Sequence, residues 1–247
     1  MKKRTTWPKL AAFALGGIAA AVITRNLAAR RREASGYPRM SEYERYAARL
    51  RLSHEALRRN LDHAVELIDQ GRVRDRKRFG EFIALYARFL ILHHDAEEHA
   101  IFPALRRSTS LRSADAAHLD RWGAEHREVN AAATALLAAR SDLLQLRQRC
   151  TELRQILEPH LVDEEAVLNA IHLPEMITEP ELAAAQRSVR GEKEAGPLMT
   201  AFLARSLSPE EREAVFGDAP WVFRSIILPQ VSRLGMRPYE PFVLHPA

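Results

Sequence analysis

The sequence predicts an all-α protein: an up-down-up-down four-helix bundle with an N-terminal apolar helix and a C-terminal helical extension. Three observations favour this fold. The chain is rich in Ala, Leu, Arg and Glu and has only 10 glycines in 247 residues, a composition that favours helix. No stretch alternates apolar and polar residues for long, so we expect little or no sheet. Four long periodic segments follow one another across short breaks, as in an up-down bundle.

Residues 1–32 form a basic segment around an apolar run. They contain no acid and eight cations: Lys2, Lys3, Arg4, Lys9, Arg25, Arg30, Arg31 and Arg32. The whole chain carries a net charge of +5, so the remainder is net negative by three. Because the remainder has no basic excess, we expect no nucleic-acid partner.

Leu10 to Thr24 is a run of 15 uncharged residues. As a helix it spans roughly 22 Å, less than the ~30 Å of a hydrocarbon core. We expect residues 1–32 to be a membrane anchor that associates with lipid through residues 7–25, with the facing side, cytoplasmic or periplasmic, left open. A cleaved secretory signal and an interfacial helix are the two alternatives.

The segment 41–172 is predicted to form the bundle. A capping box, Ser41-Glu42-Tyr43-Glu44, begins the first helix, which we expect to end at Gly71. The predicted ranges of the other three helices are 75–102, closed by Pro103, then 114–139, and then 143–170, bent at Pro159.

The segment 173–247 is predicted to be a C-terminal extension of shorter helices. Ser208-Pro209 is expected to open one of them. The apolar run from Trp221 to Leu228 is expected to pack on the bundle, with a dimer or membrane contact as the alternatives.

Histidine and glutamate recur on the apolar faces of the four predicted helices. His54 and His126 are single, whereas the second and fourth helices carry pairs spaced four residues apart, which share one helix face. These pairs are His94 with Glu98, and His160 with Glu164. We expect His63 to face solvent, and His93 and His99 to lie beside the site rather than in it.

Antiparallel geometry predicts that the four histidines lie in one layer. Take the four histidines His54, His94, His126 and His160 in order. The midpoints between neighbours in this set fall at residues 74, 110 and 143, each at or next to a predicted break. Residues equally far from a turn lie at the same height in a helical hairpin. His54, His94, His126 and His160 should therefore meet inside the bundle.

Four imidazoles and two carboxylates are costly to bury without a cation. Two bound metal ions would compensate that cost. Each ion could take two of the histidines, and both carboxylates could bridge the pair. Mixed nitrogen and oxygen ligands suit iron, manganese or zinc, and the single cysteine, Cys150, excludes a cysteine-rich metal site. Glu165 is the alternative to Glu164 if Pro159 rotates the fourth helix.

Together these motifs resemble the hemerythrin family, specifically its cation-binding HHE-type members, over about residues 41–172. The resemblance rests on the segment from His94 through Glu98 to Ala100-Ile101-Phe102-Pro103-Ala104-Leu105, on Glu125-His126, and on His160 with Glu164-Glu165. It implies a centre of two non-haem irons, with His54, His94, Glu98, His126, His160 and Glu164 as ligands. Oxygen-carrying members have five histidines, two of them one turn apart on the third helix. Here Trp122 and Asn130 occupy the turns on either side of His126, so we expect four.

The resemblance implies a protein that binds or senses O2 or NO, or that handles iron. The alternatives are a di-iron oxidoreductase, of the catalase, peroxidase or ferroxidase type, and an iron donor that repairs damaged iron centres. Four histidines favour peroxide or NO chemistry, because they leave open positions on both irons. A ferritin-like bundle is disfavoured because no histidine has a glutamate three residues before it.

Overall fold

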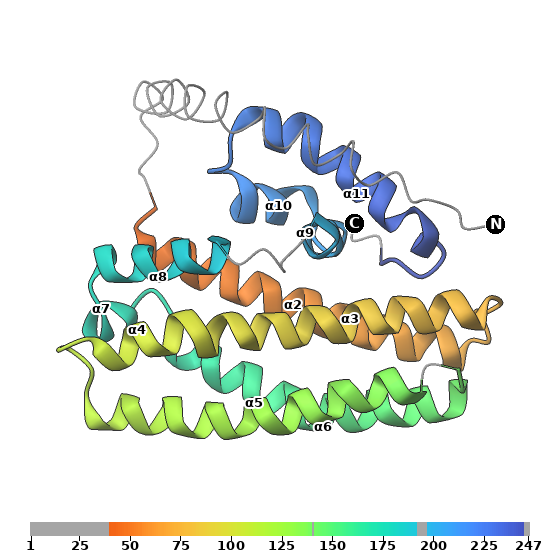
Figure 1. The fold of residues 1–247 in the computed structure, drawn as a ribbon, viewed down its shortest axis with the longest axis horizontal. Coiled ribbons are helices and arrows are strands. Elements are labelled where there is room, and N and C mark those ends of the chain that lie inside the picture. Colours follow the sequence, from red (N-terminus) through yellow and green to blue (C-terminus); the bar gives the residue numbers. More distant parts are fainter. Residues whose placement is uncertain (1–39, 140, 192–196, 245–247) are drawn as a thin grey trace, which may run out of the picture.

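The computed structural model describes residues 40–139, 141–191 and 197–244. Every regular element in these ranges is helical, as the sequence predicts. The long helical segments lie along a common axis, with successive segments joined at opposite ends (Figure 1). They are α2 (Glu42–Asp69), α3 (Arg76–Ala96) with its continuation, α5 (Ser113–Ala139) and α6 (Leu143–Val167).

Capping side chains and a glycine turn determine where the long helices begin and end. The Ser41 hydroxyl accepts a hydrogen bond from the backbone N–H of Glu44, and the Glu44 carboxylate accepts one from the backbone N–H of Ser41, which completes the predicted capping box. Gly71 follows α2 with a φ of 63°, a left-handed conformation that glycine adopts without steric cost. Asp75 and Asp142 cap α3 and α6 through their side chains.

The second long segment differs from the prediction. It does not end before Pro103 but passes from α3 through a π-helical turn, η1 (Glu97–Ile101), into α4 (Phe102–Arg107). The Phe102 N–H bonds to the Glu97 carbonyl, five residues earlier. Pro103 then lies in the first turn of α4, where its missing N–H costs little. The fourth helix is likewise unbroken at Pro159.

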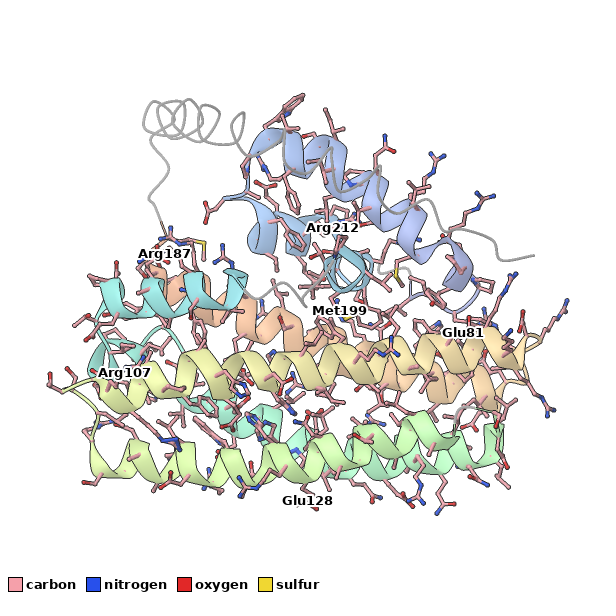
Figure 2. All side chains as sticks on the ribbon, viewed as in Figure 1. Glu81, Arg107, Glu128, Arg187, Met199 and Arg212 are labelled. Carbon is pink, nitrogen blue, oxygen red and sulfur yellow. The ribbon has the colours of Figure 1, made fainter. Side chains whose placement is uncertain are left out.

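The residues after α6 form a layer of shorter helices on the α2 and α3 side of the bundle (Figure 1). These elements are α7 (Leu173–Met176), α8 (Glu179–Gly191), α9 (Pro197–Arg205), α10 (Pro209–Phe216), η2 (Phe223–Ile227), α11 (Leu228–Met236) and η3 (Arg237–Tyr239). Figure 2 shows Met199 of α9 on the side of this layer that faces the bundle.

Aromatic side chains join this layer to α3. The Phe202 ring lies 5.1 Å from the Phe89 ring and 6.2 Å from the Phe82 ring, and the Phe242 ring lies 5.3 Å from that of Phe79. The layer and the bundle therefore share one apolar core. The run from Trp221 to Leu228, which was expected to pack on the bundle, is mostly not buried. Leu228 is buried, whereas Trp221 is 56% exposed and Ile226 is 47% exposed.

The predicted membrane anchor in residues 1–32 lies outside the described residues and stays a prediction. Within the described ranges, no helix has both the length and the apolar character needed to cross a membrane.

Replacement of Phe202 by alanine should show how strongly the layer supports the bundle. Phe202 is 1% exposed. We expect Phe202→Ala to lower the free energy of unfolding by about 3–5 kcal/mol, through lost burial and an unfilled cavity. Denaturant unfolding of the full chain measures this. Leu234, which is 54% exposed, is the control: Leu234→Ala should change stability by less than about 0.5 kcal/mol. Equal effects of the two variants would contradict the shared core.

A pH-dependent contact ties α10 to α2. Both Arg59 terminal nitrogens donate to the Glu211 carboxylate, at 2.8 and 2.9 Å. The hydrogen bonds from Arg59 lower the pKa of Glu211. Its stabilising contribution is therefore present above the unfolded pKa of about 4.3 and is lost as pH falls through the lower folded pKa.

We expect Glu211→Gln to lower stability at pH 7 by about 0.5–1 kcal/mol, since the pair is partly exposed. The difference from the unmodified chain should shrink below about pH 4. Unfolding curves recorded from pH 7 to pH 3 test this, and a constant difference across that range would contradict it.

Candidate metal centre

Seven histidine and glutamate side chains converge inside the bundle. They are His54 on α2, His93 and His94 on α3, Glu97 at the start of η1, His126 on α5, and His160 and Glu164 on α6. Six of them are at most 3% exposed, and the His93 side chain is 12% exposed. All four long segments therefore contribute to one buried polar cluster.

The atoms at the centre of this cluster have no hydrogen-bond partner. They are the Nε2 atoms of all five histidines and both carboxylate oxygens of Glu97 and of Glu164. Native proteins leave only a few buried polar atoms per hundred residues without a partner, because each unpaired atom loses its interaction with water. Nine such atoms at one place fit a site built for cations, and nitrogen and oxygen donors without thiolates suit iron, manganese or zinc.

Each carboxylate faces imidazoles on two sides of the cluster. Glu97 places one oxygen 3.5 Å from Nε2 of His93 and the other 3.7 Å from Nε2 of His126. Glu164 places one oxygen 3.4 Å from Nε2 of His126 and the other 3.5 Å from Nε2 of both His54 and His160. These separations are longer than normal hydrogen bonds and leave space for a cation between donors. Both carboxylates can therefore bridge two metal positions.

The structure places Glu97 in the cluster and Glu98, the predicted carboxylate, outside it. The prediction assumed a regular α-helix through both residues, which would pair Glu98 with His94. In the structure the α-helix ends at Ala96, and the wider π turn begins at Glu97. The Glu98 side chain is 34% exposed, and its carboxylate accepts a hydrogen bond from Nδ1 of His126 at 2.8 Å.

His93 is the second residue whose position the sequence analysis missed. It was expected beside the site, but its Nε2 faces Glu97, and its ring meets that of His54 edge-on at 4.9 Å. The sequence held one sign of this position, because His93 lies four residues before Glu97. The neighbouring pair, His94 and Glu98, has the same spacing, so the spacing did not distinguish them. His54, His94, His126, His160 and Glu164 are all brought together in the cluster.

The outer nitrogens of four histidines bind acceptor side chains. The Nδ1 atoms of His54, His126 and His160 lie 2.8–2.9 Å from Glu165, Glu98 and Glu125 respectively, and Nδ1 of His94 lies 2.8 Å from Oδ1 of Asn130. Because each partner accepts, each Nδ1 carries the proton and donates it. The lone pair on Nε2 then faces the cluster, in the tautomer that binds a metal.

Glu165, the alternative to Glu164, therefore lies outside the cluster. Besides accepting from His54, it accepts from Arg58 at 2.7 Å. Trp122 stands where the resemblance would place a further histidine, and its indole N–H donates to Asp163 at 2.6 Å. Gly123 gives Glu98 room, because a Cβ there would lie 3.3 Å from the Glu98 carboxylate.

Burial sets the charges in the cluster. Desolvation, together with the charges of Glu164 and Glu98, raises the pKa of Glu97 well above its ordinary value. Burial also acts to raise the pKa of Glu164, but the facing histidines outweigh it and lower that pKa. Burial and the neighbouring imidazoles hold the pKa values of His93 and His94 well below normal. The imidazoles of His93 and His94 are thus neutral at pH 7, the state in which an imidazole binds a metal.

Glutamine substitutions should separate the roles of Glu97 and Glu98. The raised pKa of Glu97 means that its ionised form destabilises the metal-free fold above about pH 4.3. We therefore expect Glu97→Gln to stabilise the chelator-treated protein by about 1–3 kcal/mol, yet to weaken iron(II) binding.

Glu98→Gln is the matched control. It keeps an oxygen that accepts from His126, so both the stability and the iron(II) affinity should change little. Thermal unfolding with chelator and a competitive iron(II) titration measure the two quantities. Loss of iron from Glu98→Gln alone would contradict the geometry.

One protein-family model matches the chain, over residues 46–172, and is described as the hemerythrin HHE cation binding domain. The matched range contains all seven clustered residues. No curated protein and no solved structure matches the chain.

Proposed function

The chain belongs to the hemerythrin HHE cation-binding domain family, and we propose that it holds two non-haem irons and binds O2 or NO at them. The observation that carries the proposal is the group of nine buried donor atoms without partners. Manganese or zinc would find the same donors, so metal analysis decides the ion.

Six residues would hold the two ions. His54 and His93 form one group with Glu97, and His126 and His160 lie together in another group. Glu164 faces His54, His126 and His160. When bound, an iron pair supplies open coordination positions and the electrons that interact with O2 or NO. The chain's own groups orient the imidazoles through Glu98, Glu125 and Glu165.

The surroundings of the cluster favour small uncharged ligands. The buried side chains of Ile101, Phe102 and Trp122 form an apolar cluster next to it, and the Phe102 ring stacks on that of His126 at 5.4 Å. Apolar walls exclude water and favour diatomic molecules over charged substrates. Binding or sensing of O2 or NO is therefore the function we favour.

One observation supports a second candidate, a di-iron oxidoreductase that acts on peroxide. Glu98, Glu125 and Glu165 each touch a clustered histidine and are 25–34% exposed. Such carboxylates can pass protons between solvent and the histidines, which turnover of peroxide requires. Iron storage or donation is the third candidate, and it would show as iron release to an acceptor protein.

Metal analysis of the full chain tests the centre. We expect about two irons per chain, in line with the two positions that the carboxylates join, and little iron in the double variant His54→Ala/His160→Ala, which removes one imidazole from each side. His99→Ala is the control, because His99, in η1, is exposed and lies outside the cluster. Two irons retained in the double variant would overturn the site.

Rapid mixing of the reduced protein with O2 separates the first two functions. Reversible binding predicts an absorption change that disappears when O2 is removed. Immediate irreversible oxidation, with turnover of added peroxide, would instead support the oxidoreductase.

A further inference from the structure

An exposed helical face covers the outside of the C-terminal layer. Helical structure runs without a break from Trp221 to Tyr239, through η2, α11 and η3. Its exposed residues recur about once per turn, so they share one side of the helix. We call this side the outer face, and its residues are Trp221, Ser225, Ile226, Pro229, Gln230, Arg233, Leu234, Arg237 and Pro238.

The other side of α11 packs on α9. Leu228, Ser232 and Met236, spaced four residues apart, are buried. Gly235 lies so close to α9 that a Cβ there would be 3.3 Å from the Leu198 side chain. Figure 1 shows α9 between α11 and the bundle. The outer face therefore points away from the bundle.

The outer face concentrates exposed apolar side chains. Trp221, Ile226 and Leu234 are 56%, 47% and 54% exposed. They are three of the seven large apolar side chains that the described residues expose, and the other four belong to other parts of the chain. Apolar side chains gathered on one exposed face indicate an interaction surface.

The charge of this segment is entirely positive. Residues 219–239 contain three arginines and no acid. Arg224 forms an ion pair with Glu213 at 2.7 Å. Arg233 and Arg237, on the outer face, form no ion pair with another described residue. The outer face therefore fits a partner that is both apolar and anionic.

The outer face begins beside the point where residues 1–39 join α2. Asp218, three residues before Trp221, lies 3.8 Å from Nε of Arg45 and 3.7 Å from a terminal nitrogen of Arg49. Both arginines belong to the first two turns of α2. Residues 1–32 contain eight cations, no acid and an apolar run of 15 residues. Two stretches of cationic and apolar sequence thus meet at one end of the molecule.

We propose that the outer face binds the surface of an anionic lipid bilayer. Trp221, Ile226 and Leu234 enter the headgroup region, as the apolar side of an interfacial helix does. Arg233 and Arg237 bind the lipid phosphates. This contact would hold the α11 side of the protein against the membrane, with α5 and α6 away from it.

Charge favours this partner over two others. A second copy of the chain, docked face to face, would bring arginines against arginines. Residues 1–32 carry eight cations and no acid, so the same repulsion opposes their packing on the outer face. An anionic lipid surface is attracted to both the outer face and residues 1–32.

A fluorescent label on the outer face tests the proposal in the full-length chain. Cys150, the single cysteine, is 0% exposed, and burial raises the pKa of its thiol to about 12. An environment-sensitive dye will therefore react selectively with the variant Ile226→Cys. With vesicles of equimolar phosphatidylcholine and phosphatidylserine we expect a blue shift, and quenching by spin-labelled lipid. Vesicles of phosphatidylcholine alone should give a weaker response.

Two further labelled variants make the result specific. Leu234→Cys is a second reporter on the outer face, in case Ile226→Cys folds poorly. Glu128→Cys is the control, because Glu128 is exposed on α5, on the opposite side of the molecule from α11 (Figure 2). Its label should stay in water, even when residues 1–32 hold the protein on the vesicle. Circular dichroism of each variant checks the fold.

Neutral substitutions test the role of the arginines. An arginine at an anionic surface changes binding by about five-fold. In Arg233→Gln/Arg237→Gln the ratio of lipid-facing to water-facing label should therefore fall roughly 25-fold. Arg127→Gln/Arg149→Gln removes the same charge from exposed positions on α5 and α6, and should leave that ratio unchanged.

Three results would overturn the proposal. The first is that labels at residues 226 and 234 stay in water on phosphatidylserine vesicles. The second is a label that is buried without vesicles and becomes exposed on dilution, because a second copy of the chain then covers the face. The third is a label that is buried without vesicles at every protein concentration, because the chain then covers its own face.

Discussion

The burial of carboxylates and imidazoles in an apolar helical core is the constraint on which this structure depends. Glu164 and His94 are fully buried, with atoms that bond to nothing in the protein. Without a cation, these groups oppose folding, because they lose water and gain no partner. The apolar contacts around them, and those of the α8–α11 layer, must offset that cost. A bound cation would turn the same groups into a stabilising element, because it binds the folded state alone.

Hydrogen bonds outside the cluster give its imidazoles their direction. Three partners are carboxylates near the surface, and two of these are themselves contacted by arginines, Arg58 at Glu165 and Arg121 at Glu125. The buried centre is thus connected to solvent through charged side chains. Asn130 differs, because a neutral amide carries no charge into the bundle. The arrangement of donors is therefore asymmetric, even though the sequence motifs repeat.

The π turn at Glu97–Ile101 has two consequences for the site. It turns the carboxylate of Glu97 into the cluster, and it places that of Glu98 where it holds His126. It also lets the segment continue through Pro103 into α4, whose Phe102 and Leu105 are fully buried. A wide turn of this kind is often found at functional sites, since it aims side chains that a regular helix would not.

The sequence by itself determined the all-helical class, the capping box at Ser41, the turn at Gly71 and four histidines at one height. These features follow from local hydrogen bonding and from helical periodicity, both of which are written in adjacent residues. Only the tertiary structure decided between Glu97 and Glu98, brought His93 into the cluster and paired His94 with Asn130. Both adjacent pairs have the same four-residue spacing, so periodicity alone cannot rank them. Packing between helices, and one wider turn, chose which pair faces inward.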